Sequence, residues 1–313
     1  MSVFVQQAGC RCGFAGSGAW VVLSPIEQSI KRKIEAVGKP LRDWDVSINY
    51  GIKTGFNDAF IVTTQKRDEI LAACRTEEER EKTAEILRPI LRGRDIKRYS
   101  YEWADLWLIA TFPSKHYDIE QYPAIKEHLL SFGMERLEQT GKEYVIDGQH
   151  IKARKKTNNK WFETQDSISY WEDFNKPKIV WAELARSGNA FAIDLNGNLV
   201  GNTGYILTIP DNDIDNLSFL LAFLNSRVIL YCLNLISTRF DDNGWRWLRQ
   251  FVELLLIPPC SNSEAHNRLI KIAKDTNATN QKTNSENINS IICEIMDFSE
   301  EERKYIDNAL RGY

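Results

Sequence analysis

The first regular pattern in the chain is a stripe of apolar residues at helical spacing. Ile26, Ile30 and Ile34 recur every four residues, which places them on one face of a helix. The preceding Ser24-Pro25 pair is a helix-start signal, because serine caps a helix and proline suits its first turn. We therefore predict a helix that ends at residues 38–40, where glycine and proline stop it.

Short apolar or alternating runs predict strands in the middle of the chain. Residues 46–50 and 59–63 flank a glycine-rich turn, so we predict a hairpin with a cationic tip. Further strands are predicted at residues 103–110, 178–184, 190–194 and 205–209.

Helical patterns separate and follow these strands. Helices are predicted at residues 76–87, 123–137 and 217–236, and a last one begins at the capping box of Ser299. Residues 217–236 are long and apolar enough for a membrane span, but Asn225, Ser226 and Arg227 in the middle favour a buried helix. Residues 150–160 are predicted to form a loop, and residues 275–289 an exposed or poorly ordered link.

This order of elements predicts an α+β fold, mixed and strand-rich, with an N-terminal helix and C-terminal helices. We divide the chain into an N-terminal arm with its connecting helix (1–40), a central domain (41–259) and a C-terminal helical segment (260–313).

Composition is that of an ordinary globular protein and excludes several classes. The 313 residues are 43% hydrophobic and 27% charged, which excludes collagen and a disordered chain. The net charge of -3 indicates that any affinity for nucleic acid must come from local patches. Six dispersed cysteines suggest reduced thiols, and no signal peptide is recognisable, so we expect a cytoplasmic protein with no membrane partner.

Several catalytic motifs are missing from the sequence. A phosphate-binding P-loop, a dinucleotide-binding glycine motif and a Gly-x-Ser-x-Gly elbow are all absent. Two acid–lysine pairs, Asp95 with Lys97 and Glu302 with Lys304, have the spacing found in metal-dependent nucleases. An autonomous metal-dependent DNA nuclease is therefore the alternative hypothesis.

Positive charge is concentrated in two runs. Residues 87–99 carry five positive charges and one negative charge, and residues 150–161 carry five positive charges and none negative. Such runs form solvated surfaces in many proteins, but they also supply the cations that bind DNA phosphates. Trp161 and Trp245 lie in predicted loops, where they either stack on bases or pack locally.

These cations, with polar residues beside glycine turns that could approach base edges, form the predicted DNA-binding set. The set comprises Lys53, Thr54, Asn57, Arg92, Arg94, Lys97, Lys152, Arg154, Lys155, Lys156, Lys160, Trp161, Asn202, Thr203, Arg239 and Arg246.

Several segments, read in order, resemble a known family. These are residues 20–27, 48–60, 86–99 and 177–181, followed by Leu224-Asn225-Ser226. They are similar to the TaqI-like C-terminal specificity domain, the target-recognition part of type IIG restriction-modification enzymes and adenine-N6 DNA methyltransferases. The resemblance extends from about residue 20 to residue 259 and continues more weakly to the end.

The resemblance implies a domain that grips double-stranded DNA through the major groove and works with a methyltransferase domain or subunit. S-adenosylmethionine and Mg²⁺ would serve the parent enzyme. The Asn-Pro-Pro-Tyr loop that holds a flipped adenine in that half does not occur here. We therefore expect no catalytic, cofactor-binding or metal-binding residue in this chain, and no activity from the chain alone.

Overall fold

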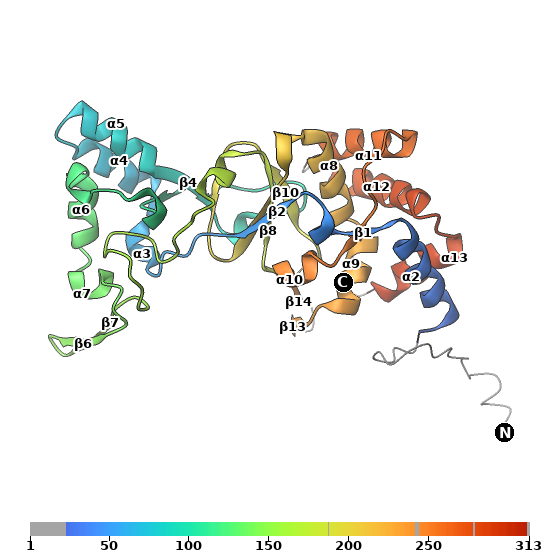
Figure 1. The fold of residues 1–313 in the computed structure, drawn as a ribbon, viewed down its shortest axis with the longest axis horizontal. Coiled ribbons are helices and arrows are strands. Elements are labelled where there is room, and N and C mark those ends of the chain that lie inside the picture. The colour runs from blue at the N-terminus through green and yellow to red at the C-terminus, as the bar shows by residue number, and fades with distance from the viewer. Residues whose placement is uncertain (1–22, 187, 242–243, 278, 312–313) are drawn as a thin grey trace, which may run out of the picture. The chain divides into compact units, whose positions relative to one another are not determined.

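The computed structural model describes residues 23–186, 188–241, 244–277 and 279–311, which form two compact units (Figure 1). Unit 1 contains residues 23–45, 188–189 and 218–311, and unit 2 contains residues 46–186 and 190–217. The predicted boundaries at residues 40 and 259 differ from this division. They differ because the N-terminal helix and all helices after residue 218 share one core.

Unit 2 contains two four-stranded sheets. The first has the order β10-β8-β12-β2 and is antiparallel throughout; the second has the order β11-β4-β5-β3, with β11 parallel to β4. The strands of the first sheet are β2 (Ser47–Tyr50), β8 (Lys178–Ala182), β10 (Phe191–Asp194) and β12 (Gly204–Thr208). Those of the second are β3 (Ile61–Thr63), β4 (Leu87–Leu91), β5 (Leu106–Ile109) and β11 (Leu199–Val200).

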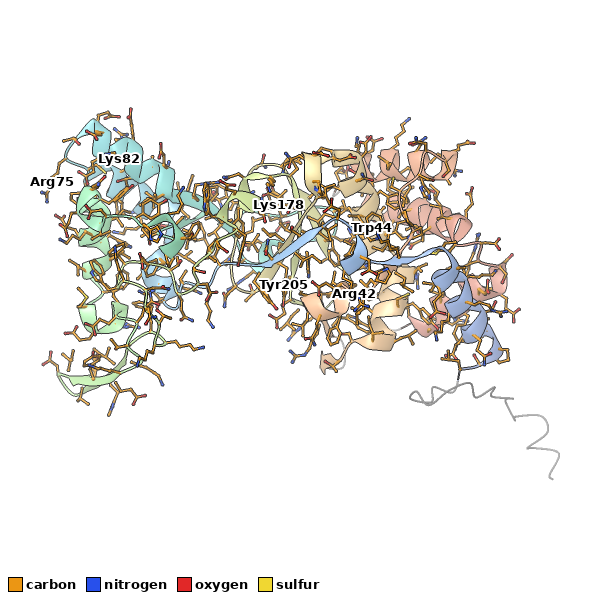
Figure 2. All side chains as sticks on the ribbon, viewed as in Figure 1. Arg42, Trp44, Arg75, Lys82, Lys178 and Tyr205 are labelled. Atoms are coloured by element: carbon orange, nitrogen blue, oxygen red, sulfur yellow. The ribbon has the colours of Figure 1, made fainter. Side chains whose placement is uncertain are left out.

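The first sheet is held by strands with no exposed position. Every residue of β8 and β12 is buried, and Trp181 of β8 stacks on Tyr205 of β12 at 5.2 Å. Lys178 at the start of β8 is fully buried and forms an ion pair with Asp194 of the neighbouring strand (Figure 2). A buried charge is tolerated because its partner is buried with it.

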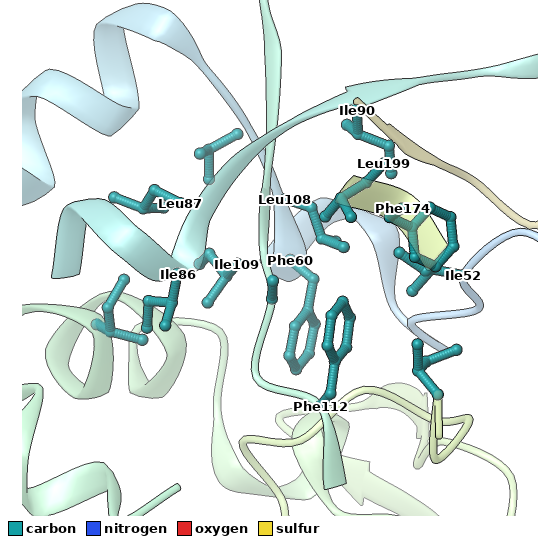
Figure 3. Packing of buried hydrophobic residues seen from close by; sticks show 14 of the residues in the cluster. Ile52, Phe60, Ile86, Leu87, Ile90, Leu108, Ile109, Phe112, Phe174 and Leu199 are labelled. Atoms are coloured by element: carbon teal, nitrogen blue, oxygen red, sulfur yellow. The ribbon is translucent and has the colours of Figure 1, made fainter. Parts of the chain in front are cut away.

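The core of unit 2 combines residues of both sheets, among them Val180 and Ile206 of the first, with residues of the helices. Figure 3 shows Phe60, Leu108 and Phe112 packed with aliphatic residues from neighbouring segments. The helices of the unit are α3 (Asn57–Phe60), α4 (Thr64–Ala72), α5 (Glu77–Ile86), α6 (Pro123–Leu130) and α7 (Met134–Leu137). The predicted helix at 76–87 is confirmed as α5, whereas the one at 123–137 is interrupted by Gly133, whose φ of 87° is incompatible with helix.

The predicted hairpin of residues 46–63 is wrong. β2 pairs with β12, and β3 pairs with β5 in the other sheet, so the two segments belong to different sheets. Local alternation identified β2 correctly, but the partner of a strand is set by distant residues. The glycine turn between the segments leads into α3 instead.

A separate two-stranded ribbon follows α7. It consists of β6 (Glu143–Ile146) and β7 (Gln149–Lys152), which pair antiparallel around an Asp147-Gly148 turn. The prediction of a loop over residues 150–160 is therefore wrong at its start. The remaining short strand of the unit is β9 (Leu184–Ala185).

Unit 1 is mainly helical. Its helices are α2 (Pro25–Val37), α9 (Arg227–Ile236), α10 (Arg249–Val252), α11 (Glu264–Asp275), α12 (Gln281–Ile295) and α13 (Glu300–Ala309), with most of α8 (Ile214–Leu224). Its short strands are β1 (Lys39–Pro40), β13 (Arg239–Asp241), β14 (Gly244–Arg246) and β15 (Leu256–Ile257). The capping boxes of Ser24 and Ser299 are confirmed at the starts of α2 and α13, and Lys33 of α2 forms an ion pair with Glu302 of α13.

The predicted single helix at 217–236 is two helices. α8 and α9 are bent by 64° at Asn225-Ser226, where Ser226 caps α9 and the Asn189 amide donates to the carbonyls of Leu224 and Ser226. These bonds satisfy the backbone groups that the break exposes. In the described part of the chain no single helix is long and apolar enough to cross a membrane, although this bent pair passes that test on length and composition.

The predicted link at 275–289 is also wrong. Most of it belongs to α12, whose residues Ile288, Ile291 and Ile292 are buried. The polar Asn-rich start of this helix concealed its apolar face. The fold class is confirmed: strands and helices are mixed, with an N-terminal helix and C-terminal helices.

Candidate nucleic-acid interface

Two glycine-containing turns lie against each other at one end of the first sheet, and we call this place the glycine crossing. Gly51 follows β2 and donates its N–H to the Gly204 carbonyl at 2.8 Å. A Cβ on Gly51 would lie 2.0 Å from the carbonyl oxygen of Gly201, so only glycine fits at this approach. The turn of residues 51–55 is thereby fixed against the turn of residues 201–204.

The first basic run lies against the same crossing. The Gly93 N–H donates to Thr203 Oγ1 at 3.0 Å, and the Gly201 N–H donates to the Leu91 carbonyl at 2.9 Å. A Cβ on Gly93 would be 2.8 Å from the Thr203 carbonyl oxygen. Three segments from distant parts of the sequence therefore meet here. Their exposed residues from the predicted set are Lys53, Asn57, Arg94, Lys97, Asn202 and Thr203.

Arg92 is held by an acid of its own run. Its Nη2 donates to Asp95 Oδ1 at 2.7 Å and its Nε to Asp95 Oδ2 at 3.0 Å. These hydrogen bonds, which Arg92 donates to Asp95, raise the pKa of the Arg92 guanidinium. Arg92 therefore neutralises Asp95, and its charge is not free for the phosphate contact that we predicted.

Neither acid–lysine pair has the geometry of a metal centre. Asp95 is buried against Arg92, and Lys97 Nζ donates to the Arg94 carbonyl at 3.0 Å. Glu302 is bonded to Ser29, Lys33 and the N–H of Ser299. Across the described ranges, no cluster of three or more His, Cys, Asp or Glu side chains could hold a metal ion.

Arg154 of the second run is buried, which contradicts its predicted contact with DNA. Its guanidinium donates to four backbone carbonyls and lies 4.9 Å from the centre of the Phe60 ring. The four acceptors are the carbonyls of Thr54 at 2.8 Å, Glu163 at 2.7 Å, Leu137 at 2.9 Å and Trp161 at 2.5 Å. Burial lowers the pKa of Arg154 to about 10, so it stays charged at neutral pH. It is an anchor that joins the turn after Lys53 to the second basic run.

The lysines around this anchor remain exposed. Lys155 and Lys156 are exposed, and so are Lys152 and Lys160. The charges of Lys53 and Lys155 both act on Asp166, where burial nevertheless raises the pKa of the carboxyl group. This shared neighbour places the second basic run beside the turn that carries Lys53.

Some exposed cations elsewhere in unit 2 are paired with nearby acids. Arg75 and Lys82, which extend outward near α5 (Figure 2), pair with Glu127 and Glu78 at 2.8 and 2.6 Å. By contrast, the described carboxylates form no ion pair with Lys155. Uncompensated positive charge therefore gathers where the predicted DNA contacts converge.

The polar residues of the glycine turns divide into two kinds. Thr54 is buried, and its hydroxyl donates to Asn57 Oδ1 at 2.7 Å and accepts from the Phe56 N–H. This burial contradicts a base-reading role for the Thr54 side chain. Asn57 and Asn202 are exposed, but the Asn57 Oδ1 already accepts from Thr54, which leaves its amide nitrogen to face a ligand.

The remaining predicted contacts belong to the other unit or pack locally. Arg239 and Arg246 belong to unit 1, in β13 and β14. Trp161 is half-buried and packs edge-on against Phe162 at 5.5 Å. Trp245 is buried, which favours packing over base stacking.

The ribbon β6–β7 is the feature that the sequence reading missed. An available signal was the Asp147-Gly148 pair between short apolar runs, since Asp-Gly is typical of tight hairpins. Its residues Gln149 and His150 are exposed beside the second basic run.

Comparison with known proteins gives one family and a shared fold. The model of the TaqI-like C-terminal specificity domain matches residues 88–250. The chain resembles the type IIG restriction endonuclease BpuSI, with a TM-score of 0.51 and 10% identity over 87% of this chain and 32% of that one. It also resembles the type IIL restriction-modification enzyme MmeI, solved in complex with DNA, with a TM-score of 0.53 and 12% identity over 83% of this chain and 34% of that one.

At such identities the two structures show a common fold. The chain spans about a third of the length of these solved proteins. No curated protein sequence matches it.

Proposed function

Since the chain belongs to the family of TaqI-like C-terminal specificity domains, we propose that it is the DNA target-recognition module of a restriction-modification enzyme that methylates adenine N6. The observation that carries this proposal is the crossing of three segments in unit 2, which gathers exposed cations and amides at one place. Lysine and arginine bind phosphates, and asparagine can bond both polar atoms of an adenine edge in the major groove.

The chemistry of the proposed enzyme resides in a methyltransferase domain or subunit. That partner would bind S-adenosylmethionine and hold the flipped adenine, and any nuclease part would use Mg²⁺. We place the enzyme in the cytoplasm, with its DNA substrate. We expect the chain alone to be silent in both reactions.

The module contributes by positioning the DNA duplex relative to the catalytic pocket. Methylation of a base in a duplex requires that the base be flipped out of the stack into the catalytic pocket. A module that holds the duplex in one register makes the encounter effectively unimolecular, and a misplacement of about 1 Å can lower the rate about a hundredfold. The sequence preference of the enzyme then follows from the side chains at the crossing.

The test is to fuse the chain to a methyltransferase domain that lacks its own recognition part and to map N6-methyladenine in plasmid DNA. We expect methylation at one defined site, and none from either part alone. Methylation by the chain alone would contradict the silent-module proposal. Fusions that methylate no defined site, although the partner domain binds its cofactor, would contradict the recognition role.

A further inference from the structure

The ribbon β6–β7 projects from the second basic run and pairs with no other described strand. Both turn residues have positive φ, 50° at Asp147 and 78° at Gly148, as a tight two-residue hairpin requires. The pairing continues below the named strands, where Ala153 donates to Lys142 and Gly141 donates to Arg154, each at 2.9 Å. The ribbon is therefore regular from its tip to the buried anchor.

The two faces of the ribbon differ. Tyr144 and Ile151 are paired in register and half-buried, and the Tyr144 hydroxyl donates to Glu138 at 2.9 Å. On the opposite face, Val145 is paired with His150, and both are exposed. One face thus fixes the ribbon to unit 2, and the other is free to meet a ligand.

The free face and the tip combine groups that suit base edges. Val145 is 66% exposed and lies beside the exposed His150 on the free face, whereas the exposed Gln149 is paired with Ile146 at the tip, on the side of Tyr144. Single exposed apolar residues are common on protein surfaces, so Val145 alone indicates little. Glutamine, however, can bond both polar atoms of an adenine edge, and an apolar side chain can contact a thymine methyl group.

The positive charge around the ribbon favours an anionic ligand. Five exposed lysines lie along the ribbon and the run that follows it, against the two acids Glu143 and Asp147 in the same stretch. These lysines are Lys142, Lys152, Lys155, Lys156 and Lys160. One of the acids, Glu143, already pairs with Lys152 at 3.1 Å. An excess of exposed positive charge at the base of a protruding ribbon complements a phosphate backbone on each side of a groove.

Resting on the proposed function, we propose that this ribbon enters the major groove of the target DNA and that Gln149 and His150 read base edges there. The major groove of B-DNA admits a two-stranded ribbon. Arg154 bonds the base of the ribbon to the Thr54 carbonyl, so the ribbon and the glycine crossing are held in fixed positions relative to each other. The target is then read by two structurally linked elements.

The experiment selects binding sites from a pool of 25-bp duplexes with randomised centres, using the full chain at low salt. The wild type is compared with the double variant Gln149→Ala/His150→Ala and with Gln65→Ala, an exposed glutamine on α4 that serves as the matched control. We expect the wild type and the control to enrich one sequence. The double variant should lose the preference at one or two adjacent base pairs of that sequence.

The affinity of the double variant for DNA then measures how much the lost base contacts contribute. On the enriched duplex, the double variant should bind roughly 5- to 150-fold more weakly, the range for one bidentate base contact. On a scrambled duplex its affinity should change less than twofold. Replacing the contacted purines by 7-deazapurines, which lack the major-groove N7 acceptor, should weaken the wild type and leave the double variant unchanged.

The outcomes separate the two proposals. If the wild type binds neither the pool nor a scrambled duplex, DNA recognition itself fails, and the ribbon inference fails with it. If the wild type enriches a sequence and the double variant enriches the same sequence with equal affinity, only the ribbon inference is overturned. Binding without any enriched sequence would also overturn the inference, while leaving phosphate contacts in place.

Discussion

The two basic runs carry the same number of positive charges, but Arg92 of the first and Arg154 of the second are held in opposite ways. In residues 87–99, Arg92 pairs with Asp95 three residues away. In residues 150–161, Arg154 has no acid in its run and is buried against carbonyls of four other residues. Accordingly, the pKa of Arg92 is raised by its hydrogen bonds to Asp95, whereas the pKa of Arg154 is lowered by burial.

This difference shows that a count of charges along a sequence overstates the charge that reaches a ligand. Each run engages an arginine, Arg92 or Arg154, with other groups of the protein and leaves its lysines exposed. The engaged arginine fixes the backbone that carries the exposed lysines of the same run. The first run does this locally, and the second does it through contacts far apart in the chain.

The largest effect is expected for Arg154→Ala. Four buried carbonyls would lose their donor, and we expect the free energy of unfolding to fall by about 3–5 kcal/mol. The measurement is urea denaturation, with the adjacent exposed Lys155→Ala as the control, which should change stability by no more than about 0.5 kcal/mol.

Equal stability of these two variants would show that Arg154 is not an anchor. Arg154→Lys should recover only part of the loss, because an ammonium group lacks the planar fork that reaches several acceptors.

The next-largest effect is expected on the affinity of the chain for DNA. The double variant Lys155→Ala/Lys156→Ala should bind all duplexes more weakly and should reduce the slope of log affinity against log salt by about 1.8, or about 0.9 for each phosphate contact. Fluorescence anisotropy over a salt series measures the slope. An unchanged slope would mean that these lysines only solvate the surface, and loss on one sequence alone would identify them as base readers.

A smaller effect is expected for Gly93→Ala in the first run. The new methyl group would meet the Thr203 carbonyl at 2.8 Å, and overpacking of this kind costs about 1–3 kcal/mol. Gly201→Ala is the matched control, since its nearest neighbours would lie 3.7 Å away. Thermal unfolding of both variants tests whether the first run is as tightly held as the structure indicates; equal melting temperatures would refute it.

The smallest effect is expected for Asn202→Ala beside the first run. If Asn202 reads a base, affinity for the correct site should fall by about 1 kcal/mol while binding to other duplexes stays the same. Competition binding with the enriched and a scrambled duplex measures the difference. Uniform weakening, or none, would mean that the glycines at 201 and 204 merely shape a turn.

Elements with local signals were predictable from the sequence. The caps at Ser24 and Ser299 and the helix of residues 76–87 depend on neighbours within four residues, and all three occur in the structure. The hairpin at 46–63 failed because the partner of β2 is β12, about 150 residues away. The break at Asn225-Ser226 depends on Asn189, which no local pattern reveals.

The candidate interface was predictable in composition but not in arrangement. Its glycines and basic runs were identified, and the structure brings Gly51, Gly93 and Gly201 together. The burial of Arg154 and Thr54 could not be predicted, because it is decided by carbonyls and side chains of segments that meet only in the folded chain. The ribbon was missed because its second strand, Gln149–Lys152, has a single apolar residue and belongs to the basic run that we predicted to be a loop.

Stepwise changes in the length of the ribbon would change which base pairs the module contacts. Side chains alternate along a strand with a period of two residues, and each residue advances about 3.4 Å, which is also the rise of one base pair in the duplex. Adding two residues to each strand at the Asp147-Gly148 turn would keep the pairing of Tyr144 with Ile151 and extend the tip by about 7 Å. New specificities could thus arise by changes of ribbon length in pairs of residues, with the core of unit 2 left untouched.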